Sequence, residues 1–74
     1  MIDYSPLWET LKRKGITQYQ LIHQYDFSPG TLDALRKNKS ITVNTMETLC
    51  LILDCTPNDI FQVNKEYEEY KEHK

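Results

Sequence analysis

Residues 16–37 read ITQYQLIHQYDFSPGTLDALRK, and two helix starts lie within this stretch. Each start is an apolar residue followed by Ser or Thr, with a second apolar residue four positions after the hydroxyl: Ile16-Thr17 with Leu21, and Phe27-Ser28 with Leu32. The hydroxyl can accept a hydrogen bond from a free N–H of the first helical turn, and the apolar pair can close over that turn. Ser28 follows Thr17 by only 11 positions, which leaves room for about two helical turns and a tight corner. This is the spacing of a helix-turn-helix motif.

The same pattern marks two more helix starts in the second half of the chain, Ile41-Thr42 with Met46 and Cys55-Thr56 with Ile60, and Ser5-Pro6 is a weaker start. Gln20 and Asp59 lie three residues after a hydroxyl, where a capping-box side chain reaches back. Pro29 and Pro57 occupy the first helical position, where a missing N–H costs nothing. The sequence therefore predicts five helices, at about 6–14, 18–24, 29–38, 43–53 and 57–62, and no convincing strand.

The apolar residues repeat with the helical period and predict one small core. Its expected members are Leu7, Leu11, Leu21, Ile22, Leu32, Leu35, Met46, Leu49, Cys50, Leu53, Ile60 and Phe61. Each large apolar side chain contributes roughly 1.5–3 kcal/mol when fully buried, which is adequate for a marginally stable domain of this size. The expected fold class is all-α, a compact domain of five helices.

A chain of 74 residues has room for one domain. We expect that domain to span residues 1–63 and to be followed by a charged tail, residues 64–74, with apolar anchors only at Tyr67 and Tyr70. The longest aliphatic run, residues 51–53, is far shorter than the ~20 residues of a membrane span, and residues 1–4 do not read as a leader. These features predict a soluble, cytoplasmic protein.

The formal net charge of -2 hides an uneven distribution of charge along the chain. Residues 12–39 carry six bases and two acids, whereas residues 40–74 carry three bases and seven acids. The basic segment contains the predicted helix-turn-helix, so a positive face on an acidic protein is one interpretation. Ordinary solvated charges are the other.

The ordered set of caps and core positions resembles the lambda-repressor-like, Cro/CI-type (XRE-type) helix-turn-helix domains. The resemblance covers residues 5–62 and rests on Thr17-Gln18, on Phe27-Ser28, on Leu32 and Leu35, and on the run 45–61. It is strongest to small bacterial and phage regulators whose recognition helix reads Ser-Pro-x-Thr-Leu and ends Leu-Arg-Lys. Two positions differ from the family pattern. Ile22 stands where the family favours a small residue, and Asp26 stands at the corner where it favours Gly, although Asp tolerates a left-handed backbone.

The resemblance implies a DNA-binding transcriptional regulator acting as a repressor, with its second motif helix in the major groove of double-stranded DNA. Residues placed for the phosphate backbone are Gln18, Ser28, Asn38, Lys39, Thr42 and Asn44. Residues expected to face base edges are Pro29, Gly30, Thr31, Asp33, Ala34 and Lys37. None of these six is the Gln, Asn or Arg that reads a base with two hydrogen bonds near a helix start. Specificity would then depend on DNA shape, on a partner or on a second copy, and we expect a homodimer on DNA.

The main alternative is a helix-turn-helix module that binds another protein and has no DNA affinity of its own. Two observations favour it: few of the outward residues can read a base, and the net charge is negative. Catalysis is not expected, because no cysteine is paired with an oriented histidine. A metal site is not expected either, because the spacing of Cys50, Cys55, His23 and His73 is not that of ligands. We therefore predict no cofactor, metal or small-molecule substrate, and two reduced cysteines whose side chains point in different directions.

Overall fold

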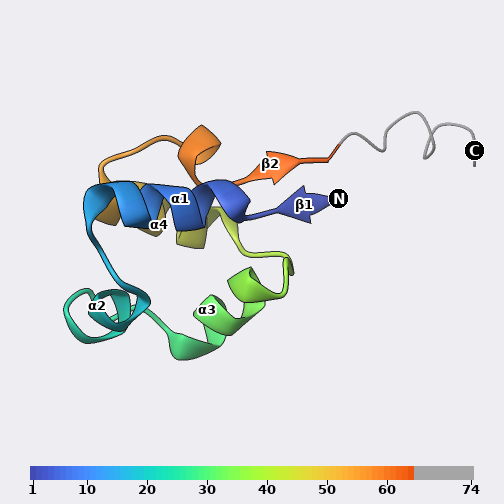
Figure 1. Ribbon diagram of the computed structural model, residues 1–74. Helices are drawn as coiled ribbons and strands as arrows, with labels where there is room; N and C mark the ends of the chain where they lie inside the picture. The colour runs from blue at the N-terminus through green and yellow to red at the C-terminus, as the bar shows by residue number, and fades with distance from the viewer. Residues whose placement is uncertain (65–74) are drawn as a thin grey trace, which may run out of the picture.

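The computed structural model describes residues 1–64 and contains four α-helices, one 3-10 turn and two very short strands (Figure 1). Their order is β1 (Ile2–Asp3), α1 (Ser5–Lys14), α2 (Gln18–His23), α3 (Pro29–Arg36), α4 (Val43–Leu53), η1 (Pro57–Asp59) and β2 (Gln62–Val63). The fold is thus mostly helical, with α2 and α3 as the helix-turn-helix predicted from residues 16–37. Of the predicted tail, residues 65–74 lie outside the described residues.

Three of the predicted helix starts are confirmed by their side-chain caps. At α2 the capping box is complete, because the Gln20 N–H donates to Thr17 Oγ1 (3.0 Å) and the Thr17 N–H donates to Gln20 Oε1 (2.8 Å). The Ser28 hydroxyl accepts from the Thr31 N–H (3.3 Å), and the Thr42 hydroxyl accepts from the Thr45 N–H (3.1 Å). These local hydrogen bonds explain why α2, α3 and α4 begin where the sequence pattern placed them.

The prediction of a fifth helix over 57–62 was wrong, and so was the prediction of no strand. η1 is a single 3-10 turn, and the chain then pairs with β1 in antiparallel register, with Val63 opposite Ile2. In a continued α-helix the Ile60 carbonyl would accept from the Asn64 N–H. Instead it accepts from the Leu7 N–H at the start of α1 (3.1 Å), and the Asn64 N–H donates to the Met1 carbonyl (2.9 Å). Two-residue strands are too short to show an alternating pattern.

Most of the core is the one that the helical periods predicted, with two additions. Buried side chains are Tyr4, Leu7, Leu11, Leu21, Phe27, Leu32, Leu35, Leu49, Leu53 and Ile60. The predicted members Ile22, Met46, Cys50 and Phe61 are only half-buried and pack around this cluster. Tyr4 and Phe27, which the sequence did not predict as core, are 1% and 7% exposed.

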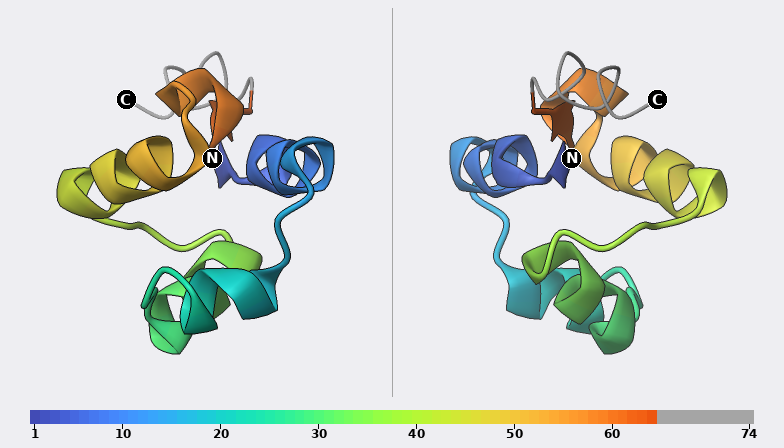
Figure 2. Two further views of the ribbon diagram at one scale, coloured as in Figure 1. Left: turned by 90° about the vertical axis from the view of Figure 1, so that its left-hand side faces the viewer. Right: turned by 90° about the vertical axis from the view of Figure 1, so that its right-hand side faces the viewer.

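The helices form two groups (Figure 2). α1, α4 and η1 contact one another and make up one side of the domain, while α2 and α3 lie together on the other side. The core lies between the two groups, so the outer surface of α3 is left uncovered. In the described part of the chain no helix is long and apolar enough to cross a membrane.

The two cysteines are free and half-buried, as reduced thiols. The prediction that their side chains point apart was wrong, because, in addition to burial, the side chain of Cys50 lies close enough to that of Cys55 to raise the pKa of the Cys55 thiol. α4 ends at Leu53, and Asp54 adopts a left-handed backbone (φ 50) that turns the chain back. As a result the Cys55 N–H donates to the Cys50 carbonyl (3.0 Å), which brings the two residues together.

Candidate nucleic-acid interface

The corner between α2 and α3 fixes how α3 is presented. Asp26 has a left-handed backbone (φ 56), as expected at the position where the family favours Gly. The next residue, Phe27, is 7% exposed, and its N–H donates to the Leu21 carbonyl at 2.9 Å. Leu21 and Leu32 are both fully buried, so the two helices are held against each other and against the core. The opposite face of α3 is directed to solvent.

The outward face of α3 carries the six residues that the sequence placed against base edges. Pro29, Gly30, Asp33 and Lys37 are exposed, and Thr31 and Ala34 are half-buried. Asp33 and Lys37 form an ion pair one helical turn apart, with 2.9 Å between Lys37 Nζ and Asp33 Oδ2. The hydrogen bond from Lys37, and then the positive charge of the same group, lower the pKa of the Asp33 carboxyl. Asp33 is therefore a carboxylate at neutral pH, and it satisfies part of the Lys37 charge.

The residues assigned to the DNA backbone fall at four places around α3: the starts of three helices and the loop between α3 and α4. Gln18 begins α2 and is half-buried, and its Oε1 accepts from Arg36 Nε at 2.9 Å. Ser28 is exposed at the start of α3, where its hydroxyl oxygen also caps the helix. Thr42 and Asn44 are exposed at the start of α4, and the Asn44 carbonyl accepts from Thr48 Oγ1 (3.0 Å).

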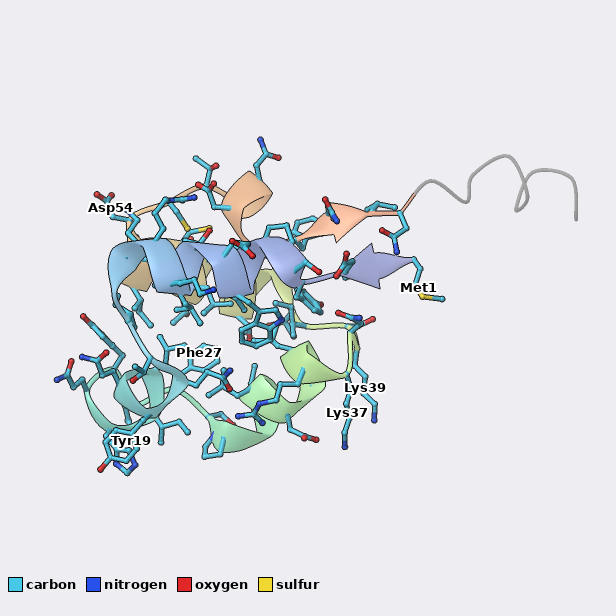
Figure 3. The ribbon with its side chains drawn as sticks, viewed as in Figure 1. Met1, Tyr19, Phe27, Lys37, Lys39 and Asp54 are labelled. Carbon is cyan, nitrogen blue, oxygen red and sulfur yellow. The ribbon has the colours of Figure 1, made fainter. Side chains whose placement is uncertain are left out.

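Asn38 and Lys39, in the loop between α3 and α4, are exposed but also tied to the fold. Asn38 has a left-handed backbone (φ 55), and its Oδ1 accepts from the Tyr4 N–H (3.1 Å). The buried Tyr4 hydroxyl donates to the Lys39 carbonyl (2.7 Å). The backbone of this loop is thus fixed from the core side, and the Lys39 ammonium extends away from it (Figure 3).

The structure brings the starts of α3 and α4 together. Thr31 lines a hollow of about 340 Å³ with four residues of the loop and of the α4 start: Ser40, Ile41, Thr42 and Thr45. Hydroxyl groups from two different helices therefore meet beside the outward face of α3. Gln18 belongs to a separate cluster, with Arg36 at the opposite end of α3.

The basic segment 12–39 and the acidic remainder of the chain are only partly separated in the folded structure. Arg13 lies 3.7 Å from the Asp59 carboxylate, and the Lys14 ammonium donates to the Asp54 carbonyl (3.4 Å). Two bases of the basic segment thus face the acidic part of the chain. Figure 3 shows Asp54 far from Lys37 and Lys39. The positive charge beside α3 comes from three residues near its end: Arg36, Lys37 and Lys39.

Two residues that position this surface were not found from the sequence. Arg36 and Tyr4 act through contacts with partners 18 and 35 positions away, and no local pattern reveals such contacts. No three His, Cys, Asp or Glu side chains within residues 1–64 are grouped to hold a metal ion. His73, one of the four metal candidates considered, lies outside the described residues.

The family model of the Cro/C1-type helix-turn-helix DNA-binding domain matches residues 6–66, most of the chain. This chain belongs to that family. The resemblance seen in the caps and core of the sequence is thereby confirmed. Among solved structures, the Cro/C1-type domain is similar to the crystal structure of the transcriptional regulator VanUg in its form II, with a TM-score of 0.75 and 24% sequence identity. The similar region covers 82% of this chain and 81% of that one, and it shows a shared fold. No curated protein matches the chain in sequence.

Proposed function

We propose that this Cro/C1-type domain is a transcriptional regulator that binds double-stranded DNA with α3 in the major groove, and that it acts as a repressor. The observation that carries the proposal is the outward face of α3, which no other described element covers and which has hydrogen-bond donors on both flanks. The similarity to VanUg, itself a transcriptional regulator, supports the regulatory role. Repression is the simplest outcome, because it requires only that the bound domain occupy the duplex.

The size and composition of α3 suit the major groove. Its eight residues give a length of about 12 Å, close to the width of the groove. Pro29 and Gly30 are small and exposed at its start, so the helix can approach the base edges closely. Thr31 can contact a thymine methyl group, and Lys37 can reach a guanine or a phosphate. Because few groups on this face can read a base directly, sequence-dependent DNA shape would contribute to specificity.

The phosphate contacts are proposed at the residues that flank α3. Gln18 would contact the backbone at the end of α3 that carries Arg36, and Ser28, Thr42 and Asn44 would contact it near the starts of α3 and α4. Asn38 and Lys39 would contact the same stretch as the α4 start. Such contacts fix the register of the protein on the duplex and carry no sequence information themselves.

The proposal is tested by a polarisation titration of mixed-sequence duplex DNA, repeated across salt concentrations. Because each neutralised phosphate releases counterions, log K should fall with log salt with a slope of about -0.9 per phosphate contact. Replacing Lys39 by Ala should reduce the steepness by about one such unit for all duplexes alike. Lys14→Ala is the matched control, because it removes the same charge from the side that faces Asp54. Absence of duplex binding at low salt would favour the alternative, a module that binds another protein.

We also propose that two copies bind a two-fold related site. One short recognition helix with few base-reading groups offers too little contact for the affinities of specific regulators. The candidate pairing surface consists of Phe61, of Val63, which is 64% exposed, and of Tyr67 and Tyr70 in the tail. Beside it is an apolar hollow of about 290 Å³ whose lining includes Ile2, Val43 and Phe61. We propose that the domain spans residues 1–63 and that residues 64–74 form the charged tail; the pairing of Val63 with Ile2 supports a domain that includes β2.

A further inference from the structure

Arg36, the last residue of α3, joins the two helices of the helix-turn-helix motif. Its Nε–H donates to Oε1 of Gln18, the first residue of α2, at 2.9 Å. The side chain of Arg36 is exposed and that of Gln18 is half-buried, so the pair lies at the surface. The hydrogen bond brings a guanidinium to the residue that the proposed function places against a phosphate.

This contact sets the orientation of the Gln18 amide. A guanidinium has donors and no acceptor, so the amide must turn its oxygen toward Arg36 and its NH₂ group away from it. The N–H groups at the end of the guanidinium have no hydrogen bond or ion pair with any residue of 1–64. The neutral NH₂ group of Gln18 and the charged terminal N–H groups of Arg36 therefore lie next to each other, and both can donate to a ligand.

Arg36 also differs from its neighbour in how far its charge is satisfied. Lys37 is in contact with the Asp33 carboxylate at 2.9 Å. Arg36 has no such partner within the described residues and acts on Asp33 only through space. The positive charge of Arg36 is therefore less neutralised by a neighbouring carboxylate than that of Lys37.

We propose that Arg36 and Gln18 form one binding unit for a backbone phosphate of DNA. In this unit Arg36 contacts the phosphate oxygens through its free N–H groups and holds the Gln18 NH₂ group toward the same phosphate. The ligand is the anionic phosphodiester, for which an arginine provides charge and directed donors together. The unit rests on the proposed function and adds to it a residue outside the set expected from the sequence.

The test compares the full chain with Arg36→Gln, Arg36→Lys, Gln18→Ala and the double variant Gln18→Ala/Arg36→Gln, using the salt titration of mixed-sequence duplex. Arg36→Gln should weaken binding by about tenfold, a loss typical of one charge-assisted contact, and should reduce the steepness of the salt dependence by about 0.9. Arg36→Lys should keep the slope and still bind more weakly, because an ammonium lacks the planar fork that serves both partners. The double variant should lose less than the sum of the two single losses, because each residue acts through the other.

Arg13→Gln is the matched control, since it removes the same charge from the face that contacts Asp59. Melting temperatures show whether each variant is folded, and the NMR signals of the Gln18 NH₂ group report positioning directly. These signals should shift on addition of duplex in the full chain and in Arg13→Gln, and should not shift in Arg36→Gln. If the full chain binds duplex and Arg36→Gln binds it with the same affinity and salt slope, the inference is overturned while the proposed function stands. The same holds if Arg13→Gln changes binding as much as Arg36→Gln does. A full chain that does not bind duplex overturns the proposed function together with the inference.

Discussion

The Tyr4 hydroxyl ties the core to the loop between α3 and α4, and its removal should lower stability by a defined amount. Tyr4 is 1% exposed, and its hydroxyl donates to the Lys39 carbonyl at 2.7 Å. Tyr4→Phe keeps the ring and deletes only this hydrogen bond, which contributes about 0.5–1.5 kcal/mol net. Lys39 is exposed, so water can replace the lost donor and the loss should lie near about 1 kcal/mol. For a domain of this size, that corresponds to a melting temperature about 4–8 °C lower.

The same residue predicts how stability depends on pH. Burial raises the pKa of the Tyr4 phenol above its ordinary value of 10.0. The folded state therefore holds this proton more tightly than the unfolded state. The corresponding stability is complete below pH 10.0 and is lost as the pH rises from there through the folded-state pKa. Tyr4→Phe should remove this part of the alkaline decline.

The assay is thermal unfolding followed by circular dichroism, at pH 7 and at several values above pH 9. Tyr19→Phe is the control, because Tyr19 is 69% exposed and its hydroxyl has no hydrogen bond within residues 1–64. Equal melting temperatures for Tyr4→Phe and Tyr19→Phe at pH 7 would refute the reasoning about the hydroxyl. An unchanged alkaline decline in Tyr4→Phe would refute the reasoning about its proton.

Three further predictions concern the caps, the thiols and the tail. Thr17→Ala should cost about 1 kcal/mol in urea unfolding because α2 loses its capping box, and Thr17→Ser should cost less; equal losses would argue against the cap. Burial, and next the neighbouring Cys50, raise the pKa of the Cys55 thiol to about 11. Its alkylation at pH 8 should therefore be about a hundredfold slower than that of a cysteine of pKa 9.0, and an ordinary rate would contradict this environment. Truncation after Asn64 should leave the melting temperature unchanged and reduce cooperative binding to a duplex with two half-sites, whereas undiminished cooperativity would exclude the tail from pairing.

The helix starts could be predicted because their signals are local. The caps at Thr17, Ser28 and Thr42 each join atoms three residues apart, so spacing along the chain is sufficient evidence. The end of the domain could not be predicted in this way. η1 stops because the Ile60 carbonyl is taken by the Leu7 N–H, and the residue pattern after Pro57 contains no trace of that contact.

The residues of the candidate site differ in the same way: those placed by local spacing could be predicted, and those placed by long-range contacts could not. The helical period of α3 was sufficient to place Asp33 and Lys37 on its outer face. The contact of Arg36 with Gln18 depends on how α2 and α3 cross, which sequence spacing does not determine. The charge pattern was misleading for the same reason, because Arg13 belongs to the basic segment and yet pairs with Asp59.

The most direct test of the central claim, that α3 and its flanks are the DNA-binding surface, is a residue-resolved NMR titration of the full chain with duplex DNA. The largest amide shift changes should fall at Gln18, across residues 28–39 and at residues 42–44, and they should persist when a minor-groove ligand fills the other groove. Changes concentrated instead on the second half of α4, η1 and β2, or changes abolished by the minor-groove ligand, would contradict the account.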